Sequence, residues 1–459
     1  MSEKRQKNQL GLAFMKEGRD ESPRSIVGGT EARMAEGKAE SPAEADRLME
    51  EILDPENLKE ALKRVKANKG SAGIDRMTVE MVSDYLKKHW PEIREQMLSG
   101  TYKPQPVLRV EIPKPDGGVR KLGIPVVVDR FLQQAVMQVL QGKWDPTFSE
   151  HNYGFRPNRS AHQGVAKAQE YIAEGYTWVV DLDLEKFFDR VNHDKLMGLV
   201  AKRITDKRVL RLIRAFLNAG VMEEGLVSAI DEGTPQGGPL SPLLSNIVLD
   251  ELDRELEQRG HRFVRYADDC NVYVRSQRAG ERVMESITGF ITKKLKLKVN
   301  REKSAVARPW ERKFLGFSFT AKEPQKRRVA PKSMVRFKER VRELTRRTRG
   351  VSLQGMVEEL NVYLRGWHGY FGFCQTPSVL VDLDSWIRRK LRCLVWKQWK
   401  RGRTRYKELR KRGVNEALAA KTAGNPHGPW RLSHSPGVCI AFPNAYFDRI
   451  GLFRLAVGR

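Results

Sequence analysis

One stretch of the sequence constrains the fold more than any other, because it joins two short alternating strands through a pair of carboxylates. Residues 263–274 have the sequence Phe-Val-Arg-Tyr-Ala-Asp-Asp-Cys-Asn-Val-Tyr-Val. β-Branched and aromatic residues on both sides of a polar turn predict a β-hairpin with Asp268 and Asp269 at its tip. An Asp-Asp pair in a turn is, on its own, more often a solvated turn than a metal site. Other parts of the chain have to decide between these two interpretations.

A second strand-like run upstream also carries carboxylates. Residues 177–184 are mostly apolar but include Asp181 and Asp183. Side chains alternate between the two faces of a strand, so both carboxylates point the same way, where an apolar core cannot absorb them. If this strand neighbours the hairpin, three carboxylates converge and repel one another unless cations neutralise them. Hard oxygen ligands select Mg²⁺, with Mn²⁺ as a possible substitute, and two such ions clamp the attacking and leaving oxygens of phosphoryl transfer.

Further motifs give these carboxylates a family context. A Tyr-Ala-Asp-Asp hairpin with an Asp on a strand 85 positions earlier resembles the palm of reverse transcriptases. In order and spacing, the surrounding motifs resemble the bacterial group II intron reverse transcriptase and maturase family, in its class that lacks an endonuclease, from about residue 45 to the C-terminus. The motifs are Ile-Pro-Lys-Pro-Asp-Gly-Gly-Val-Arg at 112–120, Tyr-Gly-Phe-Arg-Pro at 153–157, Gly-Thr-Pro-Gln-Gly-Gly-Pro-Leu-Ser-Pro at 233–242 and Lys-Phe-Leu-Gly-Phe at 313–317.

The resemblance implies a right-hand polymerase of α+β class, with fingers and palm built on an antiparallel sheet and a catalytic hairpin, followed by an α-helical thumb. A low content of apolar residues predicts a mobile tail at the N-terminus. The expected divisions are a tail at 1–40, fingers and palm at 41–325, a thumb or maturase domain at 326–405, and a small basic nucleic-acid-binding domain at 406–459.

The resemblance also assigns the chemistry to individual carboxylates. Asp183, Asp268 and Asp269 are the implied catalytic and metal-binding residues, holding two Mg²⁺ ions. Asp183 is preferred to Asp181 because the run Asp-Leu-Glu-Lys-Phe-Phe-Asp matches the family from Asp183 onward.

A second predicted hairpin supplies candidate nucleotide contacts. Residues 112–125 contain Pro-Asp-Gly-Gly between two strand-like stretches, and Lys114 and Arg120 flank that turn. By themselves these two are ordinary hairpin-edge charges, but the resemblance assigns them to the triphosphate of an incoming dNTP. Phe188 is most simply a core residue, yet the resemblance places it under the sugar, where it obstructs a 2′-hydroxyl. The resemblance also places Gln236 against the nucleotide.

Three further residues are expected along the primer and template. Gly237 belongs to a Gly- and Pro-rich loop that usually only turns the chain, but the resemblance brings its backbone close to the template base pair. Residues 313–319 predict a strand that closes the palm, with Gly316 where the primer strand comes close. Tyr266, at the end of the first hairpin strand, is the third.

Charge points to a polyanionic partner. The chain carries +27 at neutral pH, and residues 331–459 contribute 27 Lys or Arg against 9 Asp or Glu. This segment predicts basic helices that resemble the maturase domain, although a basic run is also common on a solvated face. Trp396 and Trp399 fit core anchors and RNA contacts equally. The candidate RNA-binding residues are Arg388, Arg389, Arg392, Lys397, Lys400, Arg401, Arg403, Arg405 and Lys407.

Several classes of protein are excluded. The four cysteines form no Cys-x-x-Cys pair, which argues against a disulfide framework or a zinc module. No run of about 18 apolar residues and no signal peptide are present, so no membrane partner is expected. We expect a cytoplasmic bacterial protein that joins the nucleoid when bound to DNA. The sequence also lacks the paired cysteines and histidines of an endonuclease that could nick the second target strand. We therefore expect the protein to depend on a pre-existing DNA 3′ end.

The predicted function is RNA-directed DNA synthesis from dNTPs on an RNA template with a DNA primer. The resemblance adds binding of the group II intron RNA to promote splicing, and mobility into target DNA by target-primed reverse transcription. One alternative is a host-adopted reverse transcriptase in defence or DNA repair, which flanking intron RNA would distinguish. Another is an RNA-binding splicing cofactor with an inactive polymerase, which the intact carboxylates, Gln236 and Phe188 argue against.

Overall fold

The computed structural model describes residues 47–113, 118–223, 226–228, 233 and 237–456. They fall into two compact units. The first contains the described residues up to 160 together with 180–272 and 278–306, and the second contains 161–179, 273–277 and the described residues from 307 onward. No helix among the described ranges is long and apolar enough to cross a membrane.

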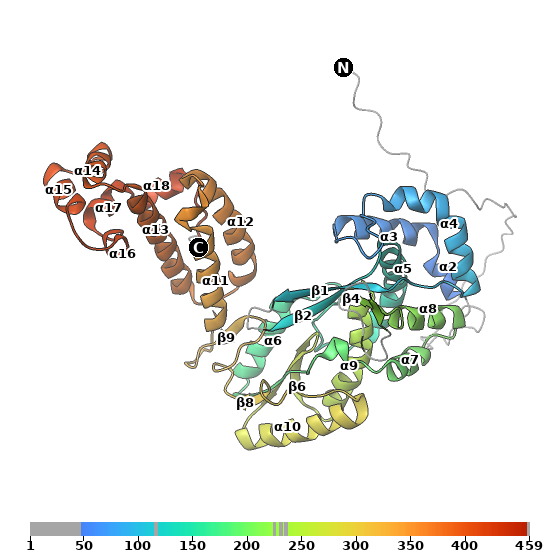
Figure 1. Ribbon diagram of the computed structural model, residues 1–459. Coiled ribbons are helices and arrows are strands. Elements are labelled where there is room, and N and C mark those ends of the chain that lie inside the picture. Colours follow the sequence, from blue (N-terminus) through green and yellow to red (C-terminus); the bar gives the residue numbers. More distant parts are fainter. Residues whose placement is uncertain (1–46, 114–117, 224–225, 229–232, 234–236, 457–459) are drawn as a thin grey trace, which may run out of the picture. The chain divides into compact units, whose positions relative to one another are not determined.

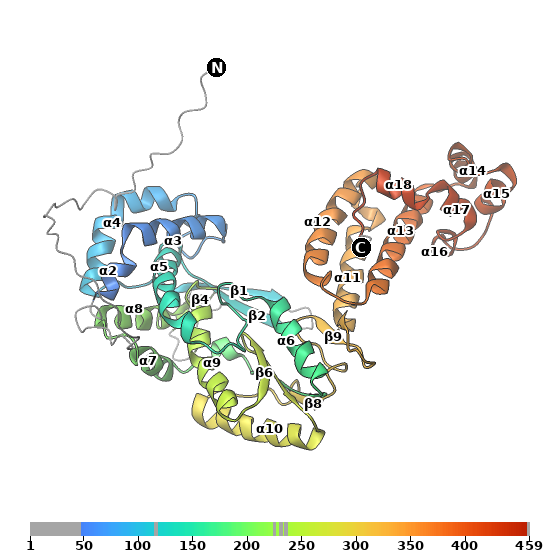
Figure 2. The same cartoon turned by 180° about the vertical axis from the view of Figure 1, so that it is seen from behind.

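Helices at the start of the first unit pack as their apolar spacing predicts. Asp54 caps one of them, accepting hydrogen bonds from the backbone N–H groups of Glu56 and Asn57, and a proline follows at the first helical position. Leu58 and its neighbours on the same face are buried against the long buried helix α5, and Figures 1 and 2 show the two helices side by side. The helices are α2 Leu48–Ile52, α3 Pro55–Ala67, α4 Val82–Ser99 and α5 Val127–Trp144.

The predicted hairpin at 112–125 is confirmed. Strand β1 (Val107–Pro113) pairs antiparallel with β2 (Val119–Ile124), and Ile112 lies opposite Arg120. Strand β4 (Val221–Glu223) adds parallel to β1, and β5 (Leu226–Ser228) pairs antiparallel with β4. The order of this sheet is β2-β1-β4-β5.

A second four-stranded sheet brings the two carboxylate-bearing segments together. Its order is β6-β7-β3-β8, so the hairpin strand β7 lies beside β3, as the sequence required. Helix α9 contacts β6, which Figure 1 shows. The strands are β3 Trp178–Leu182, β6 Arg262–Tyr266, β7 Asp269–Val274 and β8 Ala305–Ala307. The accompanying helices are α7 His193–Ala201, α8 Lys207–Leu217, α9 Ser241–Gln258 and α10 Gln277–Phe290, with a π-helical turn at Ile291–Leu295.

The second unit is mainly helical. Three long helices appear where the sequence predicted a thumb, and the third begins at Pro377. Trp396 is almost fully buried and Trp399 packs against the same core, so both are core anchors. The helices are α6 Ala161–Ala173, α11 Pro331–Leu344, α12 Leu353–Phe371, α13 Pro377–Gln398, α14 Gly402–Lys411, α15 Glu416–Ala423, α16 Pro429–Leu432, α17 Pro436–Ala441 and α18 Asn444–Arg449.

One apolar cluster runs through this helical part of the chain, from Val329 to Leu455. It joins the long helices to the small C-terminal ones. The division expected at 405/406 therefore falls inside α14 and inside a shared core.

The strand predicted at 313–319 is largely wrong. Only Phe317–Phe319 is a strand (β9), and it pairs with β10 (Arg327–Val329) in a separate two-stranded sheet. The chain turns at Gly316, whose φ is +82°, because its carbonyl oxygen accepts hydrogen bonds from the Ala330 N–H and the Ser333 hydroxyl. The segment therefore anchors the start of α11 and does not close the palm sheet.

We predict that Gly316→Ala destabilises the second unit by about 1–3 kcal/mol. Its φ is unfavourable for alanine, and the new Cβ would lie 3.1 Å from the Phe371 ring. Gly366→Ala, in α12, is the control, because a Cβ there meets nothing within 4 Å. Urea unfolding of the two variants measures the difference, and equal stability would contradict the packing described for Gly316.

Candidate active site

Two of the three predicted carboxylates lie at neighbouring strands of the palm sheet, close enough for the charge of one to act on the other. Asp183 directly follows β3, and Asp268 lies in the turn between β6 and β7. Both are half-buried. Burial raises the pKa of Asp268, the nearby charge of Asp183 raises it further, and Arg120 opposes the rise. The fold thus holds two like charges close together, and the cation of the β1–β2 hairpin lies within electrostatic reach.

The backbone of Asp183 is fixed by the segment that leads into β8. Its N–H donates to the Ser304 hydroxyl at 3.0 Å, and its carbonyl oxygen accepts from the Asn300 N–H at 2.8 Å. A bridge between Leu184 and Val299 extends the contact. Asp183 is therefore held from both sides although it lies just beyond the end of its strand.

The predicted cluster of three carboxylates is not formed. Among the described residues, no group of three or more His, Cys, Asp or Glu side chains could hold a metal ion. Asp269 is exposed and begins β7, whereas Asp268 belongs to the preceding turn. Asp183 and Asp268 nevertheless fit Mg²⁺, which is commonly held by one or two carboxylates while water and substrate phosphates fill the other positions.

A pocket of about 900 Å³ opens beside Asp268, within the first unit. Besides Asp268, three of the predicted residues line it: Arg120, Phe188 and Gly237. Gly237 has a φ of +135°, and a Cβ there would lie 2.5 Å from the carbonyl oxygen of Gly123, so only glycine fits. The predicted Lys114 and Gln236 lie outside the described residues.

The pocket also contains cations that the sequence-based prediction did not assign to it. Arg64 of α3 and Arg130 of α5 both line its wall. Arg130 is only 8% exposed, and it donates from Nη2 to the carbonyl oxygen of Ser71 at 2.7 Å. The sequence offers one indication that Arg130 is special, because this charged residue stands beside the otherwise apolar face of a buried helix. With Arg120, these residues give the pocket three guanidinium groups, which suit a polyanionic ligand.

Tyr266 is half-buried at the end of β6, and its ring centroid lies 6.3 Å from that of Phe155, another residue of the pocket wall. Gly316, by contrast, belongs to the second unit. The structure explains Gly316 through its turn and does not test a primer contact.

The candidate RNA-binding residues separate into internal and exposed groups. Arg392 is buried, donates to the carbonyl oxygen of Phe442 at 2.8 Å and serves the core, so its predicted RNA contact is wrong. Arg405 donates to the carbonyl oxygen of Trp399 at 2.8 Å and stacks on Trp396. Arg389 stacks on Trp430 and Arg388 is half-buried. The exposed members are Lys397, Lys400, Arg401, Arg403 and Lys407.

Two family models match parts of this chain. The family model described as reverse transcriptase (RNA-dependent DNA polymerase) matches residues 112–319, and that of the group II intron maturase-specific domain matches residues 334–413. Protein YkfC of Escherichia coli (strain K12) is 34% identical over 322 residues, which cover 61% of this chain and 84% of YkfC. The chain belongs to the bacterial group II intron reverse transcriptase and maturase family.

Other relatives of this reverse transcriptase match a smaller part of it. The group II intron-encoded protein LtrA of Lactococcus lactis subsp. cremoris is 37% identical over 222 residues, 48% of this chain and only 36% of LtrA. Among solved structures, a chain of a Cas6-RT-Cas1–Cas2 complex is 26% identical, with a TM-score of 0.35, covering 54% of this chain and 42% of that one. The reverse transcriptase family match confirms the right-hand polymerase fold and the RNA-directed DNA polymerase class expected from the sequence.

We predict that Asp268→Asn abolishes primer extension and leaves the protein folded, because the substitution removes a charge while nearly preserving shape. Extension in Mg²⁺ and thermal unfolding are measured on the same preparation. Asp84→Asn, an exposed carboxylate on α4, is the matched control and should extend normally. Extension by the Asp268 variant at the control's rate would overturn the site.

Proposed function

We propose that this reverse transcriptase extends a DNA primer on an RNA template in the pocket beside Asp183 and Asp268. The observation that carries the proposal is the pocket itself, which has Asp268 and three arginines in its wall, with the charge of Asp183 acting on Asp268. A polymerase needs both kinds of group, because carboxylates must face the reacting phosphate while cations face the rest of the triphosphate. The pocket lies within the part of the chain that includes the reverse transcriptase match.

In the proposed reaction the primer 3′-hydroxyl attacks the α-phosphate of a dNTP and pyrophosphate leaves. Mg²⁺, held by Asp183 and Asp268 with Asp269 as a further candidate, would supply Lewis-acid stabilisation of the attacking and leaving oxygens. Mn²⁺ is a possible substitute. Arg120 would offset charge on the triphosphate, since it opposes the raised pKa of Asp268 and lines the same pocket.

Selection between sugars is proposed for Phe188. Its ring lies in the pocket wall, and it packs edge-on against Phe187, with 5.2 Å between the ring centroids. Phe187 is buried, so it fixes the position of its neighbour. A rigid ring at this point would leave room for a 2′-hydrogen and exclude a 2′-hydroxyl. Lys114 and Gln236 remain predicted nucleotide contacts.

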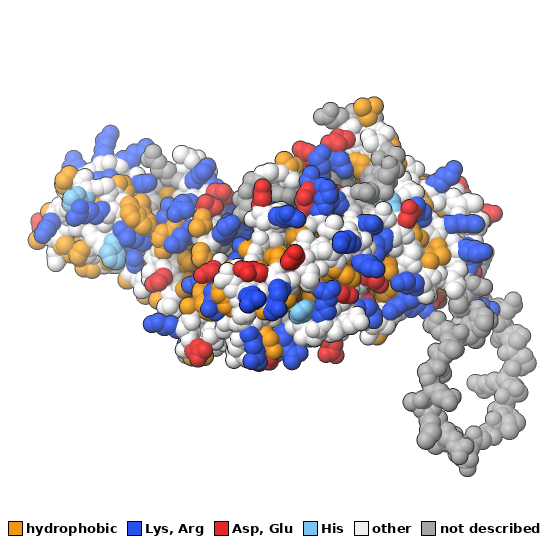
Figure 3. Space-filling model, turned by 90° about the horizontal axis from the view of Figure 1, so that it is seen from below, with side chains coloured by type: hydrophobic (Ala, Val, Ile, Leu, Met, Phe, Trp, Pro, Cys, Tyr) orange, Lys and Arg blue, Asp and Glu red, His pale blue; other side chains and the backbone are white. Residues whose placement is uncertain are grey.

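We further propose that the second unit binds the group II intron RNA, promoting splicing and, with target DNA, mobility. The maturase-specific match spans α11–α13 and α14, and the exposed cations Arg401, Arg403 and Lys407 gather at the start of α14. Figure 3 shows basic side chains spread over the face that it draws. These proposed substrates would place the protein in the bacterial cytoplasm, on the nucleoid when it engages DNA.

Shortening Phe188 to Ala should raise ribonucleotide incorporation by about 10-fold or more relative to dNTP incorporation, because the proposed obstruction is steric. The measured quantity is the ratio of kcat/KM for a dNTP to that for the matching rNTP. Both values come from one preparation, so any loss of folded protein cancels. An unchanged ratio in an active variant would return Phe188 to a core role.

The exposed cations of α14 generate a salt-dependence prediction. Replacing Arg401, Arg403 and Lys407 with Ala should flatten the slope of log affinity against log salt for intron RNA by about 2 to 3 units, if each releases one phosphate counterion. Extension of a short primer on a short template should persist.

The matched control for this variant replaces Lys87, Lys88 and Arg94 of α4, which are also exposed and carry the same total charge. An equal change of slope in the control would attribute the effect to net charge. An unchanged slope in the α14 variant would show that this face is only solvated.

A further inference from the structure

The turn that carries Asp268 is built on an unfavourable residue. Ala267 has a φ of +56°, in the left-handed region that a residue with a Cβ rarely adopts, and it is only 7% exposed. Such a conformation persists only where the surrounding structure over-determines it. Something other than the intrinsic preference of the turn must therefore fix the backbone immediately before Asp268.

The side chain of Arg265 makes one of the contacts that fix this turn. It is fully buried on β6, and its Nη1 donates to the carbonyl oxygen of Ala267 at 3.0 Å. Its Nε and Nη2 donate to the two carboxylate oxygens of Asp253 at 2.7 and 2.5 Å. A guanidinium is planar and presents its donors in a rigid fork. A bidentate grip on Asp253 therefore determines where Nη1 points.

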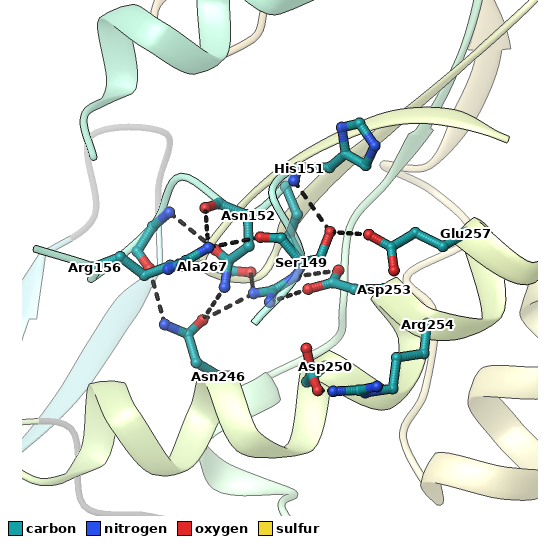
Figure 4. A network of polar contacts seen from close by, with 12 residues as sticks. Ser149, His151, Asn152, Arg156, Asn246, Asp250, Asp253, Arg254, Glu257 and Ala267 are labelled. Atoms are coloured by element: carbon teal, nitrogen blue, oxygen red, sulfur yellow. Dashed lines mark hydrogen bonds and ion pairs between the residues drawn. The ribbon is translucent and has the colours of Figure 1, made fainter. Parts of the chain in front are cut away.

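Helix α9 provides the fixed end of this contact. Asp253 and Asn246 lie seven residues apart on α9, which is two helical turns, and thus share a face. Asn246 accepts from Arg265 Nη1 at 3.0 Å and donates to the carbonyl oxygen of Gly154 at 2.9 Å. Figure 4 shows Asn246 and Asp253 directed from this helix toward Ala267 and Asn152.

The loop that contains Gly154 makes the second contact. It runs beside β6, where the Tyr153 N–H donates to the carbonyl oxygen of Arg265 at 2.8 Å and the Arg265 N–H donates to that of His151 at 2.9 Å. Gly154 then touches the turn itself, because a Cβ there would lie 2.2 Å from the backbone nitrogen of Ala267. Only a residue without a side chain permits this approach of backbone to backbone.

We propose that Arg265, aimed by Asp253 and Asn246, and Gly154 are positioning residues that hold the Ala267 turn and so set the place of the Asp268 carboxylate. This inference rests on the proposed polymerase function. Neither residue touches substrate, and both act through the backbone of Ala267. The structure gives the Tyr-Gly-Phe-Arg-Pro segment the same role, since it is the part of the chain that brings Gly154 to the turn.

A simpler alternative is that the buried ion pair only stabilises the fold. Buried ion pairs are weak evidence for stability, because apolar replacements are often neutral. The contact to the Ala267 carbonyl distinguishes the two roles, since stability alone does not require that the guanidinium reach the catalytic turn. A displacement of about 1 Å at a reacting group costs about 100-fold in rate. A small displacement of the Asp268 carboxylate should therefore lower kcat without a matching loss in the free energy of unfolding.

The first test compares two glycine substitutions in the full chain. Gly154→Ala should lower kcat for single-nucleotide addition by about 100-fold, with KM for dNTP and affinity for primer-template unchanged. Gly142→Ala, on α5, is the matched control, because a Cβ there meets nothing within 4 Å. Its kcat should equal that of the unaltered protein. If the unaltered protein does not extend a primer, the proposed function fails, and hydrogen exchange still tests the inference.

The second test uses Arg265→Lys, which keeps the charge but loses the fork. The backbone amides of 266–269 should exchange faster in the metal-free variant, while those of α7 remain unchanged, and kcat should fall as for Gly154→Ala. Adding Ala267→Gly should restore part of the lost kcat, because glycine adopts a positive φ without strain. Partial rescue supports positioning, since it would not replace a lost ion pair.

Three results would overturn the proposal. Full kcat in Gly154→Ala would show that the close approach does not position the turn. Unchanged exchange at 266–269 in Arg265→Lys would show that the guanidinium does not hold it. A kcat loss that follows the melting temperature, and is matched by the buried α7 substitution Leu196→Ala at equal destabilisation, would leave the pair with a purely structural role.

Discussion

The repulsion between Asp183 and Asp268 is the constraint on which the first unit depends. The charge of Asp183 raises the pKa of Asp268, so the two carboxylates stay together only if their backbones are held independently of their charges. The fold does this with hydrogen bonds from opposite directions. Ser304 and Asn300 hold Asp183, while the turn before Asp268 contacts Arg265 and Gly154. The palm sheet thus holds two carboxylates whose negative charges repel each other. Cations that bind with a polyanionic substrate would reduce this repulsion.

Arginine side chains have two roles in this protein, one in the core and one at the surface. The net charge does not distinguish between them. Some guanidinium groups are internal, such as Arg265 on Asp253 and Arg392 on the carbonyl oxygen of Phe442. Others remain exposed, as Arg401 and Arg403 do. The long aliphatic stem and five donors of arginine let it serve as a core residue when every donor finds an oxygen. Because some of these arginines are buried, the net charge of +27 overestimates the positive charge that is exposed to nucleic acid.

Local sequence patterns predicted most of the secondary structure and the elements that hold Asp183 and Asp268. The hairpin around Asp268 and the strand before Asp183 followed from the alternation of side chains, because this signal lies within one element. The local pattern gave a wrong prediction at Gly316, where the backbone turns instead of continuing as a strand. The run around Gly316 looked like a strand, but hydrogen bonds from Ala330 and Ser333 turn it, and both partners lie at the start of α11, beyond β9 and β10.

The sequence by itself determined the family, the polymerase fold, the two carboxylate-bearing elements and the basic character of the C-terminal helices, because motif order, periodicity and charge are all written along the chain. Tertiary structure alone decided which of these residues meet. It placed Arg130 in the pocket wall, directed Arg392 and Trp396 into the core, and set Arg265 against the carbonyl oxygen of Ala267. The reason is that a hydrogen bond or a close approach depends on the distance between elements far apart in sequence, and the sequence does not contain that distance.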